Sequence, residues 1–286
     1  DGEWWEIAGN PDLGEYNSEK QEPTAFGIWK AADESWQLFS CIRNTNCGGN
    51  TRLFHRWESE NITDRNWKPM GIAMEADAEY GETPGGLQTP HAARIRGEYV
   101  MVYGDWENIC LAKSPDGKNF ERQLNPEGVS ALFTEGKGCG TRDPMIILIK
   151  DTYYLYYTSS PGDRGAIYCR TSEDLRKWSQ AKIVSTGGSA GSGHPDAEVP
   201  VVIYLEQEQA YYLFRTHSSP DSDNFITTVY RSPDPMDFGV NDDTYKICTL
   251  PTEASWIIND NGQYYIASLL PSHKGTRIAR MKWIYK

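Results

Sequence analysis

Short apolar and aromatic runs alternate with glycine- and aspartate-rich turns along the whole chain. Runs of this kind, with a period of two and many β-branched or aromatic residues, predict β-strands. The same order recurs: an apolar strand, a turn, an aromatic strand, a polar loop and a third strand that ends in Lys or Arg. No window carries a long apolar stripe at helical spacing. Five such units begin near Phe26, Pro90, Pro144, Val199 and Ser255.

A unit of several strands that repeats every ~40–60 residues is typical of a β-propeller. We therefore predict an all-β fold, with one five-bladed β-propeller domain over residues 1–286. The last unit ends near Trp283 without a fourth strand. We expect the N-terminal segment 4–7 to supply that strand, which would close the ring and hide its edge strands.

Two carboxylates, Asp143 and Glu198, stand directly before the first strands of adjacent units. For either alone, a turn-capping Asp or a solvated Glu is the simpler interpretation. Together they indicate function, because we expect them at equivalent points of the repeat, facing one funnel with their carboxyls ~5–10 Å apart. Glycosidases need such a pair, one acid to donate a proton and one to stabilise or attack the anomeric centre. We expect Glu198 to be the acid, with a raised pKa, and Asp143 to stay ionised.

The loops that should ring this funnel carry further candidates. Asp105 and Glu107 are alternative bases, and His194 is placed to tune Glu198. The expected substrate-binding residues are Arg43, His91, Trp106, Arg142, Arg164, Arg215, His217 and Trp256.

The net charge of −12 argues against nucleic acid, which requires a basic surface, and against anionic membranes. It also weighs, less strongly, against sulfated or uronate-rich substrates. No apolar segment approaches the ~18 residues of a membrane span. The chain starts at Asp1 without Met or a signal sequence. We expect a trimmed N-terminus, an extracellular or periplasmic protein, and a monomer.

The six cysteines leave the compartment open. Cys110, Cys169 and Cys248 lie in or beside strand-like runs and are expected to be thiols. Cys41 and Cys47 flank a short polar loop and are placed to pair. Because there is no Cys-x-x-Cys, we expect no zinc site and no cofactor.

At the strand entries that carry Asp143 and Glu198, the chain resembles the five-bladed propeller glycoside hydrolases of families 43, 32, 68 and 117. Arg142-Asp143-Pro144 matches the Arg-Asp-Pro motif of families 32 and 68, in which the Asp stabilises the transition state. The resemblance makes Glu198 the general acid. It also implies a third acid at the start of the first blade, where we place Glu22, next to Pro23. Some relatives carry a channel calcium ion, on which the sequence does not decide.

The leading interpretation is a glycoside hydrolase, exo-acting on a plant or algal oligo- or polysaccharide. A carbohydrate-binding propeller without catalysis is the second, since the first-blade acid departs from the family pattern. The third is a phosphate-dependent glycoside phosphorylase, with basic side chains holding phosphate. The residues available for that role are Arg43, Arg164, Arg215, His217 and Lys274.

Overall fold

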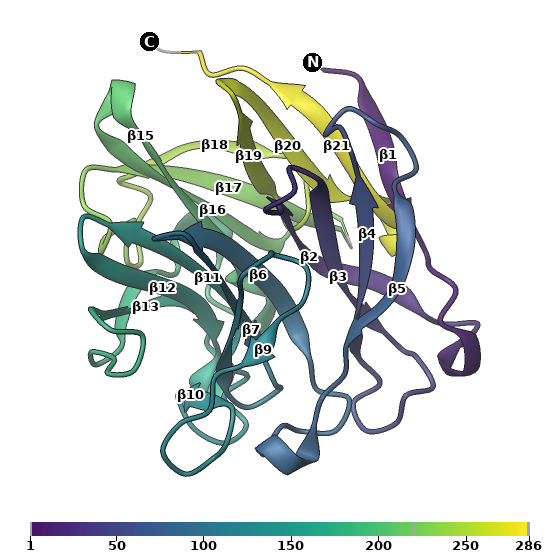
Figure 1. Ribbon diagram of the computed structural model, residues 1–286. Coiled ribbons are helices and arrows are strands. Elements are labelled where there is room, and N and C mark those ends of the chain that lie inside the picture. Colours follow the sequence, from purple (N-terminus) through teal and green to yellow (C-terminus); the bar gives the residue numbers. More distant parts are fainter. Residues whose placement is uncertain (1, 220, 223, 285–286) are drawn as a thin grey trace.

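Five antiparallel sheets stand around a central axis in the computed structural model, which describes residues 2–219, 221–222 and 224–284 (Figure 1). The predicted five-bladed propeller is confirmed, and the blades follow one another along the chain. None of the helices in these ranges is long and apolar enough to cross a membrane.

Each blade begins with the strand nearest the axis. Blade 1 holds β2 (Glu22–Lys30), β3 (Trp36–Arg43), β4 (Leu53–Ser59) and β5 (Lys68–Met74). Blade 2 holds β6 (Gln88–Ile95), β7 (Glu98–Gly104) and β8 (Ile109–Ser114), with the short β9 (Glu121–Arg122) and β10 (Ala131–Phe133). Blade 3 holds β11 (Arg142–Ile149), β12 (Thr152–Ser159), β13 (Ala166–Ser172) and β14 (Lys182–Ser185).

Blade 4 holds β15 (Glu198–Leu205), β16 (Ala210–Ser218), β17 (Phe225–Ser232) and β18 (Lys246–Leu250). Blade 5 holds β19 (Trp256–Asp260), β20 (Gln263–Leu269), β21 (Gly275–Met281) and β1 (Trp4–Gly9). Short 3₁₀ turns interrupt the loops: η1 (Gly14–Tyr16), η2 (Ala78–Tyr80), η3 (Pro161–Asp163), η4 (Gly188–Ala190), η5 (His194–Asp196), η6 (Glu206–Glu208) and η7 (Pro271–His273).

The N-terminal strand closes the ring as predicted. Strand β1 pairs antiparallel with β21, and Trp5 lies opposite Ile278. The carbonyl of Ile7 also accepts the N–H of Trp67 at 2.7 Å, which ties the closing strand to blade 1. Ile7 is fully buried and Trp5 nearly so, because both face the core between the blades.

The turns that leave the third strands share one hydrogen-bond pattern. The hydroxyl of Ser114 donates to Asp116, whose carboxylate accepts the N–H groups of Lys118 and Asn119. Ser172 and Asp174 repeat this arrangement one blade later. The Ser-x-Asp exits seen in the sequence are therefore capped turns, which explains their regular spacing.

The structure contains no disulfide between Cys41 and Cys47. All six cysteines are free thiols, and Cys41 is buried with its thiol donating to the carbonyl of Leu87 at 3.2 Å. Burial raises the pKa of the Cys41 thiol to about 11, so it is protonated at neutral pH.

Deleting residues 1–10 should lower the free energy of unfolding by at least about 3–5 kcal/mol, the typical cost of truncating one buried Trp. The deletion removes Trp5 and Ile7 from the core and leaves the edge of β21 unpaired. Thermal unfolding followed by circular dichroism measures the loss. A melting temperature equal to that of the full chain would contradict closure by β1.

Candidate active site

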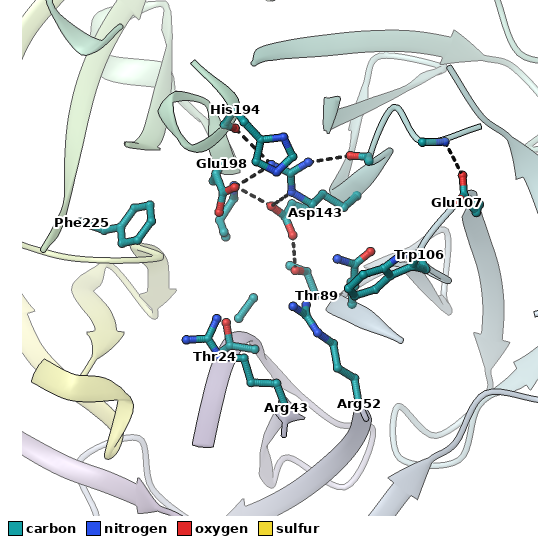
Figure 2. A pocket seen from close by; sticks show the side chains of 16 residues that line it. Thr24, Arg43, Arg52, Thr89, Trp106, Glu107, Asp143, His194, Glu198 and Phe225 are labelled. Atoms are coloured by element: carbon teal, nitrogen blue, oxygen red, sulfur yellow. Dashed lines mark hydrogen bonds and ion pairs between the residues drawn. The ribbon is translucent and has the colours of Figure 1, made fainter. Parts of the chain in front are cut away.

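A cavity of about 420 Å³ opens where the inner strands of blades 1 to 4 begin (Figure 2). Its lining combines apolar groups with polar ones, which include three arginines and three carboxylates. The lining residues are Thr24, Ala25, Arg43, Arg52, Gln88, Thr89, Trp106, Glu107, Gly138, Gly140, Arg142, Asp143, His194, Glu198, Val199 and Phe225.

Each of these inner strands enters its sheet through the same irregularity. Two residues leave the pairing register before the regular ladder begins. The pairs are Thr24-Ala25 in β2, Thr89-Pro90 in β6, Asp143-Pro144 in β11 and Val199-Pro200 in β15. Such bulges redirect side chains near functional sites. The first residue of every pair lines the cavity.

This register corrects the expectation that Asp143 and Glu198 occupy equivalent points. Val199 is the counterpart of Asp143, and Glu198 is the counterpart of Arg142. The two acids nevertheless line one cavity, since both positions lie at its wall. The backbone is left-handed at Thr89, Asp143 and Val199, with φ of 44°, 55° and 44°. Strain of about 1–3 kcal/mol at each such residue is typical of functional sites.

Asp143 is buried at the cavity wall, where it is 5 % exposed. The hydroxyl of Thr89 donates to its Oδ1, and the N–H of Val199 donates to its Oδ2 at 3.3 Å. Arg142 Nε lies 3.7 Å from Oδ2. Because the neighbouring blades 2 and 4 both supply donors, the carboxylate is fixed in place.

Arg142 links the two acids. Its Nη2 donates to Glu198 Oε1 at 2.6 Å, and the same guanidinium donates to the carbonyls of Gly140 and His194. Burial raises the pKa of Glu198 above the usual glutamate value; Arg142 opposes the rise and Asp143 adds to it. The predicted direction of the Glu198 shift is confirmed, and its larger cause is burial.

The opposite part of the cavity is formed by the loop after β7. Asp105 is buried, and its carboxylate accepts the N–H groups of Glu107 and Asn108 at 3.0 and 2.6 Å. This turn presents Trp106, held at φ 87°, and Glu107 to the cavity. Glu107 Oε2 accepts the N–H of Gly138 at 3.0 Å. Asp105 therefore positions its neighbours and does not reach the cavity itself.

Glu22, the expected third acid, is not among the residues that line this cavity. It pairs with Arg43 at 2.6 Å and faces His273, 3.8 Å away, in a neighbouring hollow. The hairpin between β2 and β3 is three residues longer than that between β11 and β12, as the sequence suggested. Even so, the pairing register makes Thr24, and not Glu22, the blade 1 residue that is equivalent to Asp143 in blade 3.

His91 and Trp256 lie deeper along the axis than expected. His91 lies two residues further along β6 than Thr89. It packs on Trp256, with ring centroids 4.7 Å apart. Burial lowers the pKa of His91 to about 3, so the ring is neutral. Trp256 Nε1 donates to the carbonyl of Ile28 at 3.0 Å. Both residues belong to the channel core and are not in contact with the cavity.

Three other predicted binding residues also lie outside the cavity. Arg215 is fully buried, and its guanidinium donates to carbonyls of Gly187, Gly191 and Asp196. It thereby holds the loop that leads to Glu198. His217 is buried, with Nε2 2.8 Å from the Thr228 hydroxyl, and Arg164 is exposed on the loop after β12.

Sequence reasoning missed several lining residues, among them Thr24, Arg52, Gln88 and Phe225. Thr24 and Gln88 could have been found from the strand entries once the bulge was recognised. Arg52 ends the loop that Arg43 begins, and only the folded loop brings both into one cavity. Across residues 2–219, 221–222 and 224–284, no group of three or more His, Cys, Asp or Glu side chains is arranged to hold a metal ion.

The fold is that of a propeller glycoside hydrolase. Residues 29–285 match the family model described as the glycosyl hydrolases family 32 N-terminal domain. The chain therefore belongs to glycoside hydrolase family 32. The match begins within β2, after the entry that carries Glu22 and Thr24.

Solved structures show the same fold. A thermostable family-43 glycoside hydrolase has a TM-score of 0.68 at 19% identity, over 96% of this chain and 93% of that one. The Bombyx mori GH32 beta-fructofuranosidase BmSUC1 has a TM-score of 0.68 at 19% identity, over 97% of this chain and 62% of that one. An endo-arabinase from Bacteroides thetaiotaomicron has a TM-score of 0.69 at 13% identity, over 99% of this chain and 98% of that one. Comparison with curated sequences gives no match.

The two neighbours of Glu198 should shift its pKa in opposite directions. Arg142 favours the charged carboxylate, so Arg142→Gln should raise the pKa of Glu198 further. Asp143 disfavours it, so Asp143→Asn should lower that pKa. Proton uptake is measured between pH 3 and 9 for the unmodified chain and for each variant, with and without Glu198→Gln. The difference within each pair gives the titration of Glu198. Shifts of the same sign in both variants would exclude this electrostatic arrangement.

Proposed function

We propose that the chain is an exo-acting hydrolase of O-glycosyl bonds in a plant or algal oligo- or polysaccharide. The observation that carries the proposal is the linkage of Asp143 and Glu198 by Arg142 within one cavity. The volume of about 420 Å³ is that of a small-molecule site, which favours action at a chain end. A screen of aryl glycosides and plant and algal polysaccharides tests the activity, and proton NMR of the first-formed anomer gives its stereochemistry.

Glu198 is suited to donate a proton to the glycosidic oxygen. A raised pKa favours the protonated form of the side chain, which a general acid requires. Arg142 holds the carboxyl group in one orientation and limits the rise. Once the bond breaks, the same guanidinium stabilises the carboxylate that remains.

Asp143 is suited to stabilise positive charge at the anomeric carbon. Its carboxylate is fixed by Thr89 and the Val199 N–H before any substrate binds. Fixed charges of this kind cost little reorganisation in the transition state, which is the main source of electrostatic catalysis.

Hydrolysis also needs a group that activates water or attacks the sugar. Thr24 stands where the first-blade acid would be, and it has no carboxylate. Glu107 lines the cavity, whereas Glu22 is linked to it only through Arg43. We place Glu107 ahead of Glu22 for this role. Thr24 also favours the second candidate, a carbohydrate-binding propeller without turnover.

Glu198→Gln should cut kcat on substrates with poor leaving groups by ~10²–10⁴-fold, since it removes the proton donor. Aryl glycosides with good leaving groups need no proton and should be cleaved almost normally. Steady-state kinetics over a series of leaving groups measures the difference. Equal loss throughout the series would indicate a binding role for Glu198.

Asp143→Asn should lower kcat far more than it weakens substrate binding, because the interaction grows in the transition state. Kinetics give kcat, and calorimetry with an unreactive oligosaccharide gives the affinity. A variant with normal kcat and weak binding would remove Asp143 from the chemistry.

The two candidates for the third acid should behave differently. Glu107→Gln should lower kcat by ~10²–10⁴-fold. Glu22→Gln should mainly raise KM, because it releases Arg43. Loss of kcat in the Glu22 variant alone would make Glu22 the third acid. Full kcat in both would favour a reaction that uses no third carboxylate.

A further inference from the structure

Arg52 is the cation of the cavity that has no anionic partner. Arg142 is paired with Glu198 and Asp143, and Arg43 with Glu22. The guanidinium of Arg52 makes neither a hydrogen bond nor an ion pair to any residue that the structure describes. A guanidinium presents five N–H donors, and without acceptors they are available to a ligand.

Contact with Trp106 holds Arg52 in a defined place. Its guanidinium carbon lies 5.0 Å from the centre of the Trp106 ring. In Figure 2 this guanidinium points toward Thr89, and that of Arg43 points toward Thr24. Stacking on an aromatic ring occupies one face of the guanidinium and leaves its edge free, which is the geometry that binds oxyanions.

Gln88 adds an independent sign of a missing ligand. It lines the same cavity, is only 7 % exposed, and its Oε1 has no hydrogen-bond partner within the described ranges. A buried carbonyl oxygen without a partner is costly, and because this atom has almost no exposed surface, it gains a donor from a ligand only if the Gln88 amide turns toward the cavity. Thr24 is small and leaves room beside these groups at the first-blade entry.

We propose that the cavity contains an oxyanion subsite, formed by Arg52 with Arg43 beside it and with Gln88 in the adjoining wall. The ligand group is a carboxylate, sulfate or phosphate. The inference rests on the proposed function, in that the cavity is taken as the sugar site. It adds that either the sugar is anionic or free phosphate is the acceptor of the glycosyl group.

The net charge of −12 does not oppose this subsite. Exposed charges more than about 8 Å away are largely screened at physiological salt. What the ligand meets is the local lining, which holds three arginines and three carboxylates and in which Arg52 forms no ion pair with any of these acids. Of these acids, Asp143 and Glu198 are paired with Arg142, and Glu107 accepts the Gly138 N–H.

With phosphate as acceptor, the reaction balances without any further reagent. A phosphate oxygen forms a bond to the anomeric carbon as the glycosidic C–O bond breaks. The proton of Glu198 passes to the leaving oxygen, and the products are a glycosyl phosphate and the shortened saccharide. No first-blade carboxylate is then required, which agrees with Thr24 at that position.

Calorimetric titration tests the subsite without depending on turnover. The probes are inorganic phosphate, sulfate and methyl glucuronide, with methyl glucoside as the neutral control, all at constant ionic strength. At least one anionic probe should bind to the unmodified chain. Arg52→Gln should weaken that binding about tenfold or more. Arg176→Gln, which removes an exposed charge outside the cavity, is the matched control and should leave binding unchanged.

The probes distinguish the sources of the oxyanion. Phosphate binding, with phosphate-dependent release of a glycosyl phosphate, assigns the subsite to the acceptor. Binding of methyl glucuronide or sulfate, with no phosphate requirement, assigns it to an anionic sugar. No binding of any anionic probe, or equal binding by the Arg52→Gln variant, overturns the subsite even if the enzyme hydrolyses neutral glycosides.

Discussion

The site depends on how the inner strands enter their blades. Two residues leave the ladder at the entries of blades 1 to 4, and the first of them faces the cavity. Asp143 adopts a left-handed backbone conformation there, as do Thr89 and Val199. Each of these four blades thus supplies one such side-chain position to the cavity, and Glu198, one residue earlier in β15, adds a carboxylate from blade 4.

The two acids of the cavity have different surroundings. Asp143 receives donors from both neighbouring blades, whereas Glu198 is desolvated and has Arg142 as its main partner. The two carboxylates therefore have unlike surroundings, and burial raises the pKa of Glu198. Arg142 serves both because its guanidinium lies between them.

The fold could be predicted because each blade repeats the same strands, turns and Ser-x-Asp exits. Asp143 and Glu198 could be predicted because they stand at strand entries. The depth of His91 could not be predicted, because it depends on the bulge register of β6. The burial of Arg215 could not be predicted either, because it depends on a loop that closes over the guanidinium. The place of Arg52 in the cavity could not be predicted either, because it depends on backbone packing between the loops of two blades. Gly85, at φ 60°, lies so close to Gly48 that a Cβ would come within 2.2 Å of the Gly48 carbonyl oxygen.

We propose that a glycosidic bond lies between Glu198 and Asp143 in this cavity. A crystal structure of the Glu198→Gln variant with an uncleaved oligosaccharide tests it most directly. We expect the substituted side chain to lie ~2.6–3.2 Å from the glycosidic oxygen, with the Asp143 carboxylate facing the anomeric carbon. A saccharide bound elsewhere, or with its glycosidic bond directed away from both side chains, would contradict it.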